Sequence, residues 1–252
     1  MKFTSRFLFI LPRLALGFGL VAAAALRAAE TDAGPPVKDR WGNWVEANFP
    51  FFSAVVDARK AGADSPSNNL TPRGLVLNLG EDQWACFDTE LLRISAVWDG
   101  TGLTPFGLAA TSYHDAGQKT KEGQTQLSTP NGRVWLANGI YPGWQSGEHP
   151  SLTDPRPSVR SPEEVGRGPL SRADGRFQAI SLSAAGACLH YTAQSAAVDE
   201  LITAIPATEG RGIRRTFRVG PANVSLLLVD GLMHPTDSAV AVSIDKIGRA
   251  HV

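Results

Sequence analysis

Short runs of apolar residues recur along most of the chain after residue 50, and turn-forming Gly, Asp, Asn and Pro separate them. Few segments show a sustained helical period. Alternation is clearest at residues 214–219, where Arg214, Thr216 and Arg218 are interleaved with apolar residues. Turns at intervals of about 8–12 residues are typical of antiparallel sandwiches and barrels. The pattern therefore predicts an all-β fold.

The apolar runs fall into two blocks with a different segment between them. The expected strands are residues 52–58, 74–79, 84–87 and 94–98 in the first block, and 177–182, 187–192, 201–205, 214–219, 224–229 and 239–244 in the second. Residues 101–170 carry eight prolines and many glycines, and show little alternation apart from residues 133–136. We expect an antiparallel, jelly-roll-like β-sandwich with a long irregular Pro/Gly-rich excursion between the two β blocks. That excursion is expected to pack Trp135, Tyr141 and Trp144 back onto the sandwich.

The N-terminus has the pattern of a secretory signal peptide. Lys2, Arg6 and Arg13 precede an uncharged, mostly apolar run at residues 14–26, and small residues follow at 22–29. The alternative is an uncleaved membrane anchor, but the run is short for a span of about 20 residues. We expect a signal peptide at residues 1–29, a leader at 30–50, a sandwich domain at 51–246, and export to the periplasm or outside the cell without membrane attachment after cleavage.

The last six residues, 247–252, match the translation of a common sequencing adapter up to its stop codon. We expect them to be adapter-derived, so that the natural chain continues beyond Lys246 and the sandwich is truncated there. A natural terminus with this sequence is the alternative.

Composition excludes some classes of function. Lys plus Arg and Asp plus Glu balance at 24 each, and the basic residues are scattered, so we expect no nucleic-acid partner. Cys86 and Cys188 are the only cysteines. Export permits a disulfide, but both lie in apolar stretches. Two free thiols and one bridge both remain open, with the bridge slightly disfavoured.

Most chemical motifs are absent from the chain. No P-loop, no Gly-x-Ser-x-Gly and no Cys-x-x-Cys-His occurs, so this sequence attaches no c-type haem by itself. The histidines are widely separated along the chain, so we expect no metal site. Asp88 is interpreted as a corner residue that accepts backbone N–H bonds. We assign no catalytic residue.

Two groups of residues are candidates for binding. His114 and Asp115 are adjacent in an expected loop and would orient a substrate or exchange protons; the plainer alternative is a turn cap and a backbone hydrogen bond. The aromatic residues Trp98, Trp135 and Trp144 would form a platform that stacks on a sugar. Their alternative role is core packing or loop anchoring.

Several short sequence motifs occur together in a fixed order along the chain. They are LTPRGLVL at 70–77, ACFDTELLR at 85–93, SYHD at 112–115, GIYPGW at 139–144, GRF at 175–177, LHY at 189–191 and RRTF at 214–217. The set resembles an uncharacterised N-terminal domain of large exported bacterial proteins. Those proteins carry a c-type cytochrome module and a glucose/sorbosone-dehydrogenase-like β-propeller. Residues 187–191, ACLHY, depart from the plainer strand expected there.

The resemblance implies a function for the parent protein rather than for this chain. The parent would oxidise a sugar or alcohol at a quinone in the propeller and pass electrons to haem c, with both cofactors outside this sequence. The present chain would be a non-catalytic accessory module that contacts the C-terminal modules of the same protein. The competing hypothesis is a carbohydrate-binding domain, or part of a polysaccharide hydrolase, with a glycan as its partner.

Overall fold

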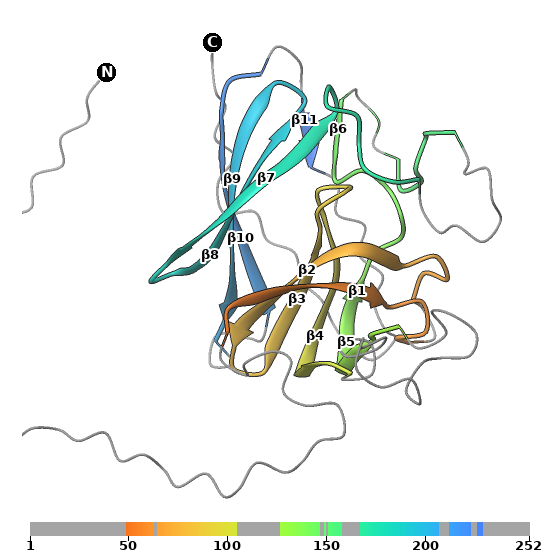
Figure 1. Cartoon of the computed structure of the whole chain (residues 1–252), viewed down its shortest axis with the longest axis vertical. Coiled ribbons are helices and arrows are strands. Elements are labelled where there is room, and N and C mark those ends of the chain that lie inside the picture. The colour runs from red at the N-terminus through yellow and green to blue at the C-terminus, as the bar shows by residue number, and fades with distance from the viewer. Residues whose placement is uncertain are drawn as a thin grey trace, which may run out of the picture. The chain divides into compact units, whose positions relative to one another are not determined.

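The computed structural model describes residues 49–62, 65–104, 127–146, 149, 151–157, 167–206, 212–222 and 226–228. Within these ranges the regular secondary structure consists of β-strands, which form two larger antiparallel sheets and a two-stranded ribbon (Figure 1). The predicted all-β antiparallel sandwich is confirmed. No helix in the described part has the length and hydropathy of a membrane span. The expected signal peptide, most of the leader, the run 239–244 and residues 247–252 lie outside the described residues.

Sequential strands lie side by side in both larger sheets. The first sheet has the order β1-β2-β3-β4-β5, and the second has the order β10-β9-β8-β7. The first contains β1 (Phe51–Asp57), β2 (Leu70–Gly80), β3 (Gln83–Asp88), β4 (Arg93–Leu103) and β5 (Pro130–Ala137). The second contains β7 (Gly175–Ser183), β8 (Gly186–Ala193), β9 (Ala196–Ile205) and β10 (Gly212–Val219), while β6 (Trp144–Ser146) pairs with β11 (Leu226–Leu228).

The connections correct one detail of the expected architecture. A jelly roll is built from Greek-key crossings between its two sheets. Here the short turns at residues 81–82, 184–185 and 194–195 keep sequential strands adjacent, so each larger sheet is a meander. The strands are those of a sandwich, but the jelly-roll connectivity was wrong for the described strands.

The segment 101–170 is more regular than the sequence predicted. It contains the end of β4, the edge strand β5 and the short strand β6. A Cβ atom on Gly132 would overlap the carbonyl oxygen of Asp99 on β4, so this glycine permits close strand approach rather than a loop. The expected packing of the aromatics is confirmed, since Tyr141 and Trp144 are buried and Trp135 packs against the same core.

The main core lies between the two larger sheets. Alternate residues of β3 and β8 face each other there, including Ala85, Phe87, Leu189 and Tyr191. The rings of Phe87 and Tyr191 have centroids 5.7 Å apart, and Phe177 of β7 lies 6.2 Å from Phe87. Burying each large apolar side chain stabilises the fold by about 1.5–3 kcal/mol, so this contact layer holds the sheets together.

A second apolar cluster lies on the other face of the five-stranded sheet. Trp84, Cys86, Trp98 and Val56 belong to it. The N–H of Asp57 donates to the carbonyl of Ser128 over 2.8 Å, which links the end of β1 to the segment that leads into β5. The first sheet therefore has apolar packing on both faces, as near-continuous apolar strands such as β3 require.

The corner between β3 and β4 is built around a buried ion pair. Asp88 Oδ1 accepts hydrogen bonds from the N–H groups of Glu90 and Leu91, at 3.0 and 3.2 Å, which confirms its predicted corner role. The Arg93 guanidinium lies 3.3 Å from Asp88 Oδ2, and both side chains are almost completely buried. Arg93 also donates to the carbonyl of Asn138. Burial raises the pKa of Asp88, and Arg93 opposes that rise.

A chain of buried polar groups crosses the main core. Trp144 Nε1 donates to the Tyr191 hydroxyl over 3.0 Å, and that hydroxyl donates to Glu200 Oε2 over 2.7 Å. Arg215 Nε donates to the other carboxylate oxygen over 2.7 Å. Burial and the neighbouring Glu200 carboxylate raise the pKa of Tyr191. This chain ties β6, β8, β9 and β10 together, because each of these strands contributes one member.

The two cysteines point away from each other. Cys86 faces the second apolar cluster, on the side of its sheet opposite the main core. On β8, Ala187 and Leu189 face the main core, so Cys188 between them faces the outer side of the other sheet. Both are free thiols, and a bridge between opposite outer faces would require the strands to be rebuilt.

We expect two thiols that differ in accessibility. Burial raises the pKa of Cys86 to about 12, so it should react with a thiol reagent only after unfolding, whereas the half-buried Cys188 should react in the native protein. Titration with and without denaturant, on unreduced protein, measures both. The Cys188→Ser variant should lose the native-state reaction. Absence of free thiol after unfolding would contradict this arrangement.

Candidate functional site

The binding residues predicted from the sequence do not form one site among the described residues. Trp98 is fully buried in the second apolar cluster, and its Nε1 donates to the carbonyl of Gly102. Trp144 is buried in the main core, on the other face of the sheet. Trp135 is half-buried against that core. Because Trp98 and Trp144 are buried in different clusters, Trp98, Trp135 and Trp144 form no stacking platform, and the core-packing alternative describes these three residues. His114 and Asp115 lie outside the described residues.

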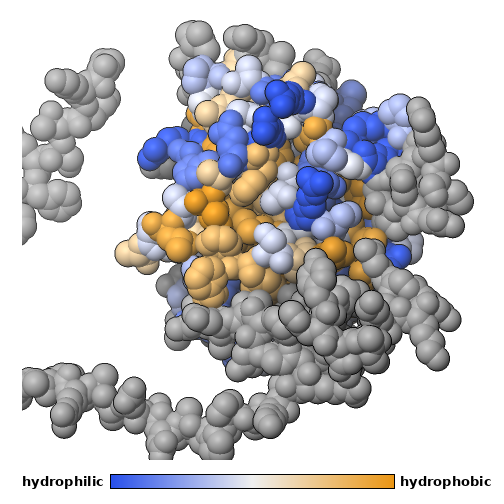
Figure 2. Space-filling model, in the orientation of Figure 1, coloured by the Kyte–Doolittle hydropathy of each residue, from blue (hydrophilic) through white to orange (hydrophobic). Residues whose placement is uncertain are grey.

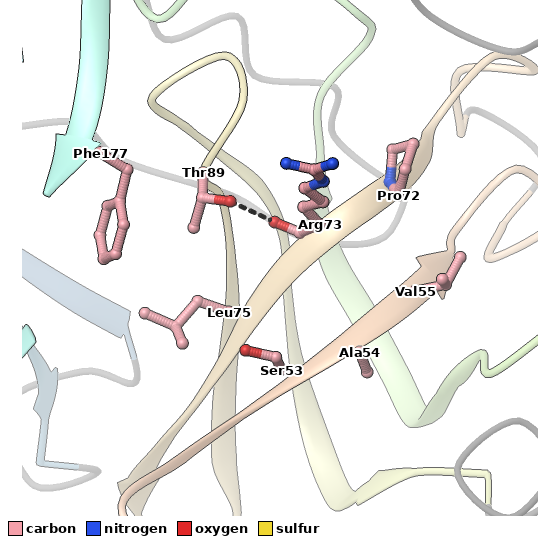
Figure 3. Close-up of a pocket in the computed structure, with 8 residues that line it drawn as sticks. All are labelled: Ser53, Ala54, Val55, Pro72, Arg73, Leu75, Thr89 and Phe177. Atoms are coloured by element: carbon pink, nitrogen blue, oxygen red, sulfur yellow. Dashed lines mark hydrogen bonds between the residues drawn. The ribbon is translucent and has the colours of Figure 1, made fainter. Parts of the chain in front are cut away.

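An open apolar hollow lies between the two sheets, beside the outermost strands β1 and β7. Its volume is about 480 Å³. The lining residues are Ser53, Ala54, Val55, Pro72, Arg73, Leu75, Thr89 and Phe177. Figure 3 shows Leu75 of β2 and Phe177 of β7 pointing toward each other across the hollow, with Ser53 on the β1 side.

One rim of the hollow is held by the β3–β4 corner. The Thr89 hydroxyl donates to the carbonyl of Arg73 over 2.8 Å, which fixes the corner to β2 (Figure 3). Arg73 lies 3.3 Å from Glu90, and its side chain is 73% exposed. Burial, with the nearby Asp88 carboxylate, raises the pKa of Glu90. The hollow is therefore an apolar surface with one charged pair at its edge.

The apolar character extends beyond the hollow. Figure 2 shows orange residues gathered over β1 and over the β7–β8 hairpin, with blue residues above and to the right of them. Phe49, just before β1, is 44% exposed, and Leu182 on β7 is 56% exposed. Contiguous apolar surface rimmed by polar residues is typical of an interaction site.

A second candidate is a row of polar side chains on the outer face of the four-stranded sheet. Ser181 Oγ lies 2.7 Å from His190 Nε2, and His190 Nδ1 lies 2.7 Å from Asp199 Oδ1. Arg218 lies 3.6 Å from the other oxygen of Asp199. Each of the four strands contributes one residue to this row, and the row faces away from the main core.

This row is not apparent from the sequence, for an identifiable reason. Ser181, His190 and Asp199 are spaced nine residues apart, and only the strand register brings them together. The turns at 184–185 and 194–195 set that register. We had expected the third strand of this meander to begin at residue 201, whereas β9 begins at Ala196, so Asp199 was not placed on a strand.

Metal ligation finds no support in the described part of the chain. No group of three or more His, Cys, Asp or Glu side chains is arranged there to hold an ion. His149 is exposed, and His190 is engaged with Ser181 and Asp199.

Comparison with known protein families gives a match to part of the chain. Residues 85–200 match a domain of unknown function, DUF6797. The DUF6797 segment runs from β3 to β9, so it contains the β3–β4 corner, the Phe177 wall of the hollow, and the Ser181, His190 and Asp199 row. Comparisons with curated proteins and with solved structures give no match. The match agrees with the predicted resemblance to an uncharacterised domain.

Proposed function

We propose that this chain is an accessory binding module of an exported, haem-containing sugar or alcohol dehydrogenase-like protein. The observation that carries the binding role is the apolar hollow between β1, β2 and Phe177. The resemblance of the sequence motifs to the N-terminal domain of such proteins supports the assignment to this kind of parent protein. The C-terminal modules of that protein are the proposed partner, and the periplasm or the cell exterior is the proposed location.

The occupant that best fits the hollow is an extended apolar segment of polypeptide. Strand β1 ends the order of its sheet and has β2 as its neighbour among the described strands. The N–H of its last residue, Asp57, already donates to Ser128, so it is the outer backbone groups before Asp57 that face the side where another strand can pair. Adding a strand to a sheet edge supplies main-chain hydrogen bonds, while side chains at alternate positions fill adjacent pockets. Leu75 and Phe177 supply such an apolar pocket next to β1.

The residues of this chain do not fit the covalently attached haem of the proposed parent. Covalent haem attachment needs two cysteines and a histidine in one short motif. Cys86 and Cys188 instead lie on opposite outer faces of the sandwich. This supports the accessory role, in which electron transfer would occur in other modules. The glycan-binding alternative is not supported by the proposed aromatic platform, because Trp98 and Trp144 are buried and cannot stack on a sugar.

Blocking the hollow should weaken segment binding. Ser53 is exposed on the lining, so Ser53→Arg places a long charged side chain in the hollow without disturbing the core. Peptides selected from a random phage-displayed library should bind the native chain and bind Ser53→Arg at least about tenfold more weakly, since burying an unpaired charge is costly. Fluorescence anisotropy measures both affinities.

The matched control is Thr216→Arg, which adds the same charge at an exposed position on β10. It should bind the selected peptides as the native chain does. Equal affinity of the peptides for Ser53→Arg and the native chain would exclude the hollow as the docking site. Binding of a glycan that competes with no peptide would favour the alternative function.

The chain on its own should have no redox activity. When it is purified from an export-competent host with cytochrome maturation, we expect no Soret absorption and no dye reduction with sugars or alcohols. A Soret band would contradict this expectation. Sequencing the gene beyond the codon for Lys246 tests the proposal that the parent is a haem-containing dehydrogenase-like protein. A downstream Cys-x-x-Cys-His motif would support that proposal, and a glycoside-hydrolase domain would contradict it.

A further inference from the structure

The hydrogen-bonded row on the four-stranded sheet has the atomic arrangement of an activated serine. Asp199, as a carboxylate, accepts hydrogen bonds only, so the proton between Asp199 and His190 resides on Nδ1. Nε2 of a neutral imidazole is then an acceptor, and it lies 2.7 Å from Ser181 Oγ. In hydrolases that use serine, histidine and aspartate, the same pair of contacts removes the hydroxyl proton.

We propose that Ser181 is a nucleophile, that His190 is its general base, and that Asp199 is the residue that positions His190. The site is independent of the proposed docking hollow. Ser181 lies on the outer face of β7, whereas Phe177 of the same strand packs against the main core. The two proposals therefore fail or succeed separately.

The reaction class is acyl transfer from a small ester. Ser181 Oγ bonds to the ester carbonyl carbon, and its proton passes to His190 Nε2. The carbon–oxygen bond to the alcohol breaks, and the alcohol leaves with that proton. Water then attacks the acyl-serine through the same imidazole, which releases the carboxylic acid and restores Ser181.

The edge position of β7 supplies a donor for the oxyanion. Strand β7 ends the order of its sheet, with β8 as its neighbour among the described strands. In an antiparallel edge strand, alternate residues direct their N–H groups away from the neighbour, so we expect the N–H of either Ser181 or Leu182 to serve as the oxyanion donor. One donor is fewer than a full oxyanion hole provides, so we expect slow turnover.

The exposure of the row sets the class of ester. Ser181 is exposed, and the side chains of His190 and Asp199 are 32% and 38% exposed. Because all three side chains are at least partly exposed, the fitting substrates are unhindered esters such as acetyl esters. Arg218, whose side chain is 87% exposed, adds a positive charge at the far end of the row.

Covalent labelling of the native chain tests the proposal. A fluorophosphonate probe should modify Ser181, as located by mass spectrometry, and p-nitrophenyl acetate should acylate the same residue. Ser181→Ala should abolish both modifications. Ser183→Ala, two residues along the same exposed strand, should be labelled as the native chain is. General-base catalysis contributes about 10²–10⁴-fold, so His190→Ala should lower the labelling rate by at least about 100-fold, and added imidazole should restore part of it.

Asp199 requires a readout that separates positioning from folding. Asp199→Asn should lower the labelling rate at an unchanged melting temperature, and Asp199→Glu should retain more of the rate. The proposal is overturned if Ser181 in the native chain is labelled no faster than Ser183. It is also overturned if His190→Ala leaves the labelling of Ser181 unchanged.

Discussion

The buried ion pair between Asp88 and Arg93 is the constraint on which the arrangement of the two sheets depends. It closes the β3–β4 corner, and three other segments hydrogen-bond to that corner. The N–H of Gly143 donates to the backbone carbonyl of Leu91, and the N–H of Leu170 donates to the backbone carbonyl of Glu90. The Thr89 hydroxyl donates to the carbonyl of Arg73 on β2. A Cβ atom on Gly143 would overlap the carbonyl oxygen of Leu92. The corner thereby fixes one rim of the hollow and the approach to β6 and β7.

Much of the fold was predictable because its strands are short and its turns are local. The runs at 74–79, 84–87 and 94–98 lie within β2, β3 and β4, since apolar packing on both faces of this sheet makes them nearly continuous. Strand β9 was predicted too short because Asp199 and Glu200 interrupt its apolar pattern. Glu200 nevertheless faces the core, where Tyr191 and Arg215 satisfy its carboxylate. A single sequence gives no sign of such a partner.

The candidate sites were far less predictable than the strands. The aromatic residues Trp98, Trp135 and Trp144 suggested a binding platform, but Trp98 and Trp144 gain more by burial in two different clusters. The hollow depends on how the edges of two sheets meet, which no local pattern specifies. The row from Ser181 to Asp199 depends on register, and a shift of one residue would turn these side chains to the opposite face.

A double-mutant cycle on the β3–β4 corner tests most directly whether the buried ion pair organises the two sheets. Unfolding free energies in urea are measured for Asp88→Asn, Arg93→Met and the double variant, with Arg73→Met as an exposed control. Breaking a buried pair costs about 3–5 kcal/mol, so each single variant should lose that much, and the double should lose less than their sum. Arg73→Met should cost under about 1 kcal/mol. Small, additive losses at Asp88 and Arg93 would contradict a corner that organises the two sheets.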